Sequence, residues 1–292
     1  MDTWRGTREG VPRLARMLKR HGAGATFLFS LGPDHTGRAL RRVFRKGFFS
    51  KVSRTSVLSH YGIRTLLYGT LLPGPDIGRR GADILRAVRE EGFEVGIHCW
   101  DHVLWQDNVA QAGAAWTERQ MLLAVERFQS IYGEKPRAWG AAGWQTNRHA
   151  QRLIDRIGLD YSSDTRGRAP FMPCWGGESF RHPELPTTLP TLDELIGING
   201  VDEGNVASRI LELTAQPSSH VFTAHAELEG GKLMPAFEQL IGGWQAQGYD
   251  VVSARALFAS LDLARLPRHE IEYGSIAGRS GSVAIQGKEV SQ

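Results

Sequence analysis

Apolar and polar positions alternate along most of the 292-residue chain in two different rhythms. Short apolar runs bounded by turn residues are typical of buried strands, and apolar positions that recur three and four residues apart are typical of helices. Met121, Leu122, Val125 and Phe128 show the helical spacing. Because the two kinds of segment alternate, the pattern predicts βαβ units and a mainly parallel sheet.

The pattern places the individual elements as follows. Strands are predicted at residues 25–30, 94–98, 137–140, 160–163, 220–224 and 249–252. Helices are predicted at residues 8–20, 82–91, 117–132, 148–157, 206–213, 234–247 and 254–261. We assign residues 1–267 to one α/β domain.

Three segments depart from the alternation. Residues 32–76 form an insertion after a predicted strand. Residues 166–200 are rich in Pro and Gly and predict a long loop with a short extended piece near 185–189, as loops over active sites often have. The tail, residues 268–292, is rich in Gly and Ser, and we expect it to be peripheral or partly disordered.

The first residues lack an element that an α/β barrel needs. A strand-first barrel begins with an apolar strand of about five residues. Here Asp2 and Thr3 follow Met1 directly, and the first predicted helix starts at residue 8. We therefore expect the chain to begin at the end of its first strand.

Composition narrows the class of protein. With 41% apolar and 23% charged residues, the chain is that of a globular protein rather than a fibrous or disordered one. It has no apolar run of about 18 residues and no secretory signal at its start, and its two cysteines, Cys99 and Cys174, are too few for a disulfide scaffold. These features predict a cytoplasmic protein without a transmembrane helix.

Charge is spread unevenly although the net charge is only +4. No Asp or Glu occurs from His35 to Pro75, and in the stretch GRALRRVFRKGFFSKVSR apolar residues fall at helical spacing among arginines and lysines. A basic amphipathic helix of this kind can lie in a membrane interface. It can equally pack on the domain with its charges in solvent. Nucleic acid is disfavoured as a partner because no binding motif accompanies the charge.

A histidine pair is the sharpest chemical signal. His98 and His102 are four residues apart at the end of a predicted strand, so a helical turn or a tight bend would let both reach one metal ion. Asp2, Asp164 and His225 also end predicted strands, and in α/β barrels these ends face the catalytic mouth. Two histidines and a carboxylate with an open position make a catalytic metal site.

The order of these motifs resembles that of the NodB-homology polysaccharide deacetylases, carbohydrate esterase family 4. The motifs are Asp2-Thr-Trp, His98-x-x-x-His102, Ala141-Ala-Gly-Trp144, Asp164-Thr-Arg166-Gly and Thr223-Ala-His225, and the resemblance runs to about Arg279. It implies a single distorted (β/α) barrel with a truncated first strand. Within the family, the chain is most similar to deformylases of lipid A modification and polymyxin resistance, which act on 4-deoxy-4-formamido-L-arabinose carried on undecaprenyl phosphate.

The resemblance also implies roles for single residues. Asp2, His98 and His102 would bind a divalent metal, zinc by default, with cobalt or manganese as alternatives. His225 would be the general acid that protonates the departing amine, and Asp164 would orient it and raise its pKa.

Other residues have a pocket role with a structural alternative. Trp100, Trp144 and Arg166 would line the sugar pocket, or else serve only in packing. A backbone N–H near Ala142 or Gly143 would help the metal to stabilise the oxyanion.

Three further residues near these motifs have competing interpretations. Cys99 could be a metal ligand, although on a strand it would point away from His98. Glu227 and Glu229 could contact a sugar amine or simply be solvated.

The family's general base has no counterpart in this sequence. In the family an acid just before the metal-binding aspartate acts as the base, and the position two before Asp2 does not exist here. Gln145 also stands near where the family has an arginine. The base is therefore expected upstream of Met1, or it is lost.

Three functions remain open on these grounds. They are the deformylase, an N-deacetylase of another amino sugar or polysaccharide, and a non-catalytic carrier-lipid or glycan-binding protein. The first implies a substrate linked to undecaprenyl phosphate and peripheral contact with anionic lipid at the inner face of the bacterial inner membrane.

Overall fold

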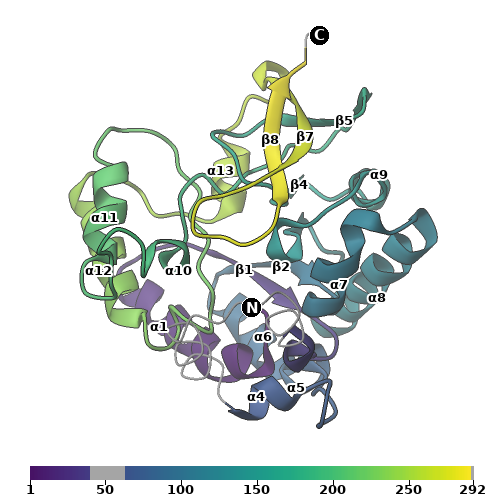
Figure 1. The fold of residues 1–292 in the computed structure, drawn as a ribbon, viewed down its shortest axis with the longest axis horizontal. Helices are drawn as coiled ribbons and strands as arrows, with labels where there is room; N and C mark the ends of the chain where they lie inside the picture. Colours follow the sequence, from purple (N-terminus) through teal and green to yellow (C-terminus); the bar gives the residue numbers. More distant parts are fainter. Residues whose placement is uncertain (40–62, 291–292) are drawn as a thin grey trace.

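A four-stranded parallel sheet lies at the centre of the computed structural model, which describes residues 1–39 and 63–290 (Figure 1). Its strands run in the order β1 (Thr26–Ser30), β2 (Glu94–Cys99), β3 (Ala138–Trp139) and β4 (Tyr161–Ser162), and each neighbouring pair is parallel. The predicted α/β class with a parallel sheet is therefore confirmed.

Helices that the periodicity predicted surround this sheet (Figure 1). They are α1 (Val11–Arg20), preceded by a π-helical turn at Gly6–Gly10, α6 (Ala82–Glu90), α8 (Ala114–Tyr132), α9 (Arg148–Ile157), α11 (Val206–Leu213), α12 (Met234–Ala246) and α13 (Ala254–Ala259). Most of these helices bury one face, and together with fully buried strand residues such as Phe29 and Ile97 they form the main core. All seven predicted helices are confirmed.

Several short helices were not predicted, because four to seven residues give too few turns for a periodic signal. These are α4 (Ile63–Leu67), α5 (Ile77–Arg80), α7 (His102–Asn108) and α10 (Leu192–Leu195), with 3-10 turns at Val109–Gln111, Ala142–Trp144 and Leu263–Arg265. Two of them, α7 and α10, prove to carry residues of the candidate site.

Two predicted strands are extended but join no sheet. Residues 220–224 and 249–252 belong to no strand, and both segments line one cavity together with β1. The Gly24 N–H donates to the Val251 carbonyl (2.8 Å) just before β1, but no ladder continues from that bond. Met1 lies beside β1 instead. Its α-amino group donates to the Leu28 carbonyl (3.0 Å), and its carbonyl accepts from the Ser30 N–H (3.1 Å). This is the position expected for the end of a strand.

The tail and the long loop build a second sheet, with the order β6 (Glu178–Ser179), β5 (Met172–Trp175), β7 (Arg268–Gly274), β8 (Val283–Glu289). The alternative of a partly disordered tail is therefore wrong for residues 268–290, which form ordered strands in a sheet separate from the central one. Ile271 and Ala284 are buried against Phe171 of the long loop, and this contact orders both segments. The extended piece near 185–189 is confirmed, since Thr187 bridges to Arg166.

The insertion leaves and rejoins the domain at one point. Pro33 and Asp76 form an isolated bridge, and the Ile77 N–H donates to the Gly32 carbonyl (2.8 Å). The predicted basic amphipathic helix falls in residues 40–62 and lies outside the described residues. Within the described ranges, no helix combines the length and apolar character needed to cross a membrane.

Candidate active site

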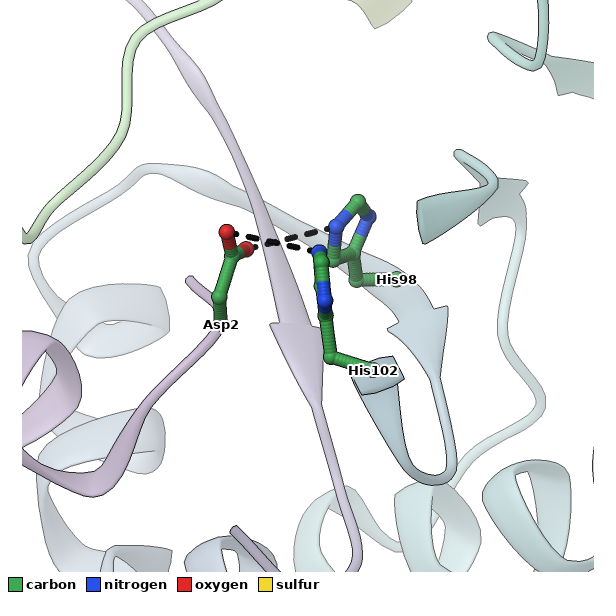
Figure 2. A group of neighbouring side chains, drawn as sticks. All are labelled: Asp2, His98 and His102. Carbon is green, nitrogen blue, oxygen red and sulfur yellow. Dashed lines mark ion pairs between the residues drawn. The ribbon is translucent and has the colours of Figure 1, made fainter. Parts of the chain in front are cut away.

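Three side chains from distant parts of the sequence converge where the central strands end. Asp2 comes from the segment beside β1, His98 from β2, and His102 is the first residue of α7 (Figure 2). Asp2 Oδ1 lies 3.4 Å from His98 Nε2, and Asp2 Oδ2 lies 3.4 Å from His102 Nε2. The potential ligand atoms all lie within 4.8 Å of one another. The structure thus brings together the three predicted ligands.

Local structure orients the imidazoles of His98 and His102 towards Asp2. His98 Nδ1 lies 2.6 Å from the Gly140 carbonyl oxygen, so this nitrogen carries the proton and Nε2 faces Asp2. Asp101 caps α7 by accepting from the Leu104 N–H (3.0 Å), which starts the helix at His102. The bend between β2 and α7 therefore brings the histidine pair to one point.

The protonation states also suit a metal. Burial lowers the pKa of His102 to about 4, so its imidazole is neutral at pH 7. Burial opposes ionisation of Asp2, yet the imidazoles and the α-amino group hold its pKa well below its usual value. Neutral imidazoles and a carboxylate are the forms that bind a metal, and Asp2 Oδ1 is buried without a hydrogen bond in the described structure. These residues therefore fit a divalent cation.

His225 lines the same cavity, and acids surround it. Its backbone N–H donates to Glu229 Oε2 (2.6 Å), while its Nδ1 has no hydrogen bond within residues 1–39 and 63–290. Burial lowers the pKa of His225, but nearby carboxylates, Asp193 foremost, outweigh burial and raise it. A raised pKa favours the protonated imidazole, which is the form that can donate a proton to a leaving group.

Asp193 was missed in the sequence because it ends no predicted strand. It lies in the short helix α10, whose start is fixed by a capping box between Thr191 and Glu194. The pattern Thr-x-x-Glu in TLDE is the signal that could have placed a helix here. Asp193 lines the cavity together with His225.

Asp164 does not pair with His225, contrary to the prediction. Its carboxylate accepts from the Ala141 N–H (2.8 Å), the Thr146 hydroxyl (3.1 Å) and the Gln151 side-chain amide (2.8 Å). The strand end does carry it to this side of the sheet, but it points inward and is fully buried. Burial and the neighbouring Glu184 raise its pKa. Asp164 holds the loop after β3 rather than the general acid.

The three predicted pocket residues have different positions. Trp144 lines the cavity, and its ring stands edge-on to that of His225, with centroids 6.4 Å apart. Arg166 lies behind Trp144, with its guanidinium 4.9 Å from the ring centroid. Trp100 does not line the cavity and packs beneath Arg127, so its structural alternative describes it better.

Glu227 and Glu229 are buried and serve the backbone of the site. Glu227 Oε1 accepts from the N–H groups of Asp2 (3.0 Å) and Thr3 (2.8 Å) and so fixes the segment that carries the metal ligand. Neither glutamate lines the cavity, so the predicted alternatives of sugar contact and free solvation are both wrong.

One cavity of about 670 Å³ contains all the groups that can do chemistry here. Asp2, His98, His102, Asp193 and His225 lie along it. Apolar residues of α1, β1 and α12 line much of the rest, together with polar residues such as Gln106 and Asp250. The size suits a small molecule such as a modified sugar.

Comparison with known proteins finds the same family over the region that holds Asp2, His98 and His102. Residues 2–162 match the polysaccharide deacetylase family. A protein of Shewanella sediminis named "Probable 4-deoxy-4-formamido-L-arabinose-phosphoundecaprenol deformylase ArnD" is 34% identical over 292 residues, which is 100% of this chain and 94% of that protein. A protein of the same name from Wigglesworthia glossinidia brevipalpis is 29% identical over 284 residues, 97% of this chain and 99% of that protein.

A solved structure shares the fold. The crystal structure described as "probable Polysaccharide deacetylase from Pseudomonas aeruginosa PAO1" superposes with a TM-score of 0.56 at 20% identity, covering 87% of this chain and 72% of that one.

Proposed function

Because this chain belongs to the polysaccharide deacetylase family, we propose that it is a metal-dependent amide hydrolase that removes the N-formyl group from 4-deoxy-4-formamido-L-arabinose carried on undecaprenyl phosphate. The observation that carries the proposal is the convergence of Asp2, His98 and His102 in one cavity with a protonatable His225. The choice of substrate is supported by the 34% identity, over the whole of this chain, with the Shewanella sediminis protein named a probable deformylase.

Each group has a task in amide hydrolysis. A divalent metal held by the three ligands, zinc by preference, with cobalt or manganese as alternatives, would supply Lewis acidity and lower the pKa of water. His225 donates the proton that the departing amine needs, and Asp193 favours the protonated form of His225. The loop with Ala142 and Gly143 is the proposed source of an oxyanion donor, and Gly143 lines the cavity.

Such a substrate determines where the protein would work. An undecaprenyl-phosphate carrier stays in the bilayer, so the enzyme would act as a peripheral protein at the inner face of the bacterial inner membrane. At that surface, the basic residues of the insertion, residues 32–76, would contact anionic lipid.

The experiment replaces His98 or His102 with alanine and measures bound metal and release of formate. Each variant is expected to lose both, because two ligands no longer form a site. His149→Ala is the control, since His149 does not line the cavity. A His98→Ala variant that keeps metal content and turnover would contradict the proposal.

Matched substrates test the choice of acyl group. A pocket fitted to a formyl group disfavours an acetyl group by about 1–3 kcal/mol for the extra methyl. Faster release of acetate than of formate would instead favour N-deacetylation of another amino sugar or polysaccharide, in keeping with the family description, which names polysaccharide deacetylase activity. Metal binding without either product would favour a carrier-lipid or glycan-binding protein.

A further inference from the structure

One cation in the cavity has no role in the chemistry described above. Arg279 lies in the turn between β7 and β8 and is the only Lys or Arg among the described residues that line the cavity. The second sheet is what brings this residue of the tail to the same cavity as Asp2, His98 and His102 (Figure 1).

Arg279 is held in place mainly by stacking. Its guanidinium lies 4.5 Å from the centroid of the Trp144 ring, and Arg166 lies 4.9 Å from the same centroid. The cation–π contact with the Trp144 indole, which Arg166 also makes, fixes the orientation of Arg279. Such a contact contributes only a modest stabilising free energy. The Trp144 ring also stands edge-on to His225, so Trp144 connects the cation with the general acid.

The hydrogen-bonding capacity of Arg279 is largely unused in the described structure. An arginine has five N–H donors. Here Nη2 makes one long contact with the Gly143 carbonyl oxygen (3.5 Å), and Nη1 lies 3.7 Å from Glu194 Oε1. Glu194 already accepts two hydrogen bonds from Arg166, at 2.6 and 2.9 Å. The carboxylate nearest to Arg279 therefore belongs to another cation.

A nearly buried guanidinium with free donors is suited to bind an anion. The Arg279 side chain is only 18% exposed, so few waters compensate its charge. The planar donor fork matches the geometry of a phosphate or carboxylate, and such charge-assisted pairs are strong. Because the cavity also holds the hydrolytic groups, the anion would be part of the molecule whose amide is cleaved.

We infer that Arg279 recognises a phosphate ester on the substrate sugar and so selects glycosyl phosphates over neutral glycans. This inference rests on the proposed hydrolysis of a sugar formamide. A pyranose ring separates a substituent on its first carbon from one on its fourth, so phosphate and amide can occupy different ends of one cavity. Arg279 is then a specificity-determining residue.

The test uses two soluble substrates that differ only in the phosphate. They are the methyl glycoside of 4-deoxy-4-formamido-L-arabinose and the matching sugar 1-(methyl phosphate). The variants are Arg279→Gln and Arg279→Lys, with Arg268→Gln as a control on the same hairpin, since Arg268 is exposed and does not line the cavity. Thermal unfolding confirms that each variant is folded.

We expect Arg279→Gln to lower kcat/KM for the phosphate substrate by about 10- to 100-fold, mainly through KM, and to leave the neutral glycoside within about threefold. Arg279→Lys should fall between, because it keeps the charge but loses the fork. Arg268→Gln should match the wild type. Equal losses on both substrates, or no loss on either, would overturn the inference.

Calorimetric binding separates this inference from the proposed function. If the wild type hydrolyses neither formamide, the proposed function fails, but Arg279→Gln should still weaken binding of the sugar phosphate more than binding of the neutral glycoside. Inorganic phosphate is the third ligand. If it binds as tightly as the sugar phosphate, the site holds free anions and substrate selection by Arg279 is wrong.

Discussion

Burial decides the chemistry of Cys99 although it is next to a proposed metal ligand in sequence. The thiol is fully buried, points away from His98 and contacts the Ser30 hydroxyl (3.2 Å), and burial raises its pKa. A protonated thiol is a poor nucleophile and a poor metal ligand. We predict that Cys99→Ala keeps the full metal content of the wild type, measured by elemental analysis.

The native thiol gives an independent measurement of the same point. Cys99 should react with a thiol reagent only after unfolding, because it has no exposed surface. Rapid labelling of the folded protein at Cys99, or loss of metal in Cys99→Ala, would revive the alternative in which this residue is a ligand.

Asp193 sets the pH range of the proposed general acid. Its charge helps to raise the pKa of His225 against burial. His225 must be protonated to act, so activity declines as the pH rises through that pKa, and removing the nearby charge lowers it. We predict that Asp193→Asn moves the alkaline limb of the kcat/KM profile to lower pH, by up to about one pH unit.

An acid outside the cavity provides the control for this profile. Asp202→Asn should leave the limb in place, because Asp202 is exposed and does not line the cavity. A limb that stays unchanged in Asp193→Asn would show that another group controls the alkaline side.

At the scale of residues, the sequence predicted the candidate site residues at the ends of regular strands and missed those that lie in other segments. His98 lies near the end of a strand that is easy to locate, and His102 follows that strand. Asp193 lies in a four-residue helix and Arg279 in a turn. Segments this short have no hydrophobic periodicity from which the direction of a side chain could be predicted. Asp164 does end a strand, but only the packing around it reveals that the carboxylate points inward.

Helix α1 begins against the loop that carries His225, and glycine allows that approach. A Cβ on Gly10 would overlap the carbonyl oxygen of Ala226, a backbone atom that cannot move alone. We predict that Gly10→Ala destabilises the protein by about 1–3 kcal/mol and lowers turnover, as measured by chemical denaturation and formate release.

Gly242 provides a matched control within a helix. It lies inside α12, and a Cβ there would meet no atom within 4 Å. Gly242→Ala should leave turnover unchanged and raise stability by about 0.5–1 kcal/mol, because alanine is the better helix former. Equal effects of the two substitutions would show that the contact between Gly10 and Ala226 is unimportant.

At the scale of elements, periodicity located helices well, because most of them bury one face in the core. Strands depend on partners that sequence does not show. Residues 220–224 have the apolar pattern of a strand and line the cavity, and although Val221 and Thr188 are hydrogen-bonded, no ladder forms between their segments. Strands β7 and β8 lack a strong apolar pattern, yet they pair because Phe171 of a distant loop covers them.

At the scale of the whole molecule, the described residues form two sheets that differ in how many buried apolar contacts support them. The central sheet lies in the main core, whereas the second sheet covers a small cluster of Phe171, Ile271 and Ala284. Regions with few buried apolar contacts open at lower free energy. We predict that amides of β7 exchange with deuterium at least about tenfold faster than those of β2, measured by mass spectrometry.

These two strands make a fair comparison because each lies between two neighbours in its own sheet. Similar exchange rates would mean that the two sheets unfold together. Faster exchange in β7 would instead mean that the segment carrying Arg279 can leave the cavity while the metal ligands stay in place.

The position of Met1 has a practical consequence for protein engineering. Its amino group is hydrogen-bonded to β1 beside Asp2, so a fusion partner joined there would continue along that strand edge and crowd the cavity. The last strand, β8, runs away from the central sheet towards Glu289 (Figure 1). Affinity tags and fluorescent fusions therefore belong at the carboxyl end.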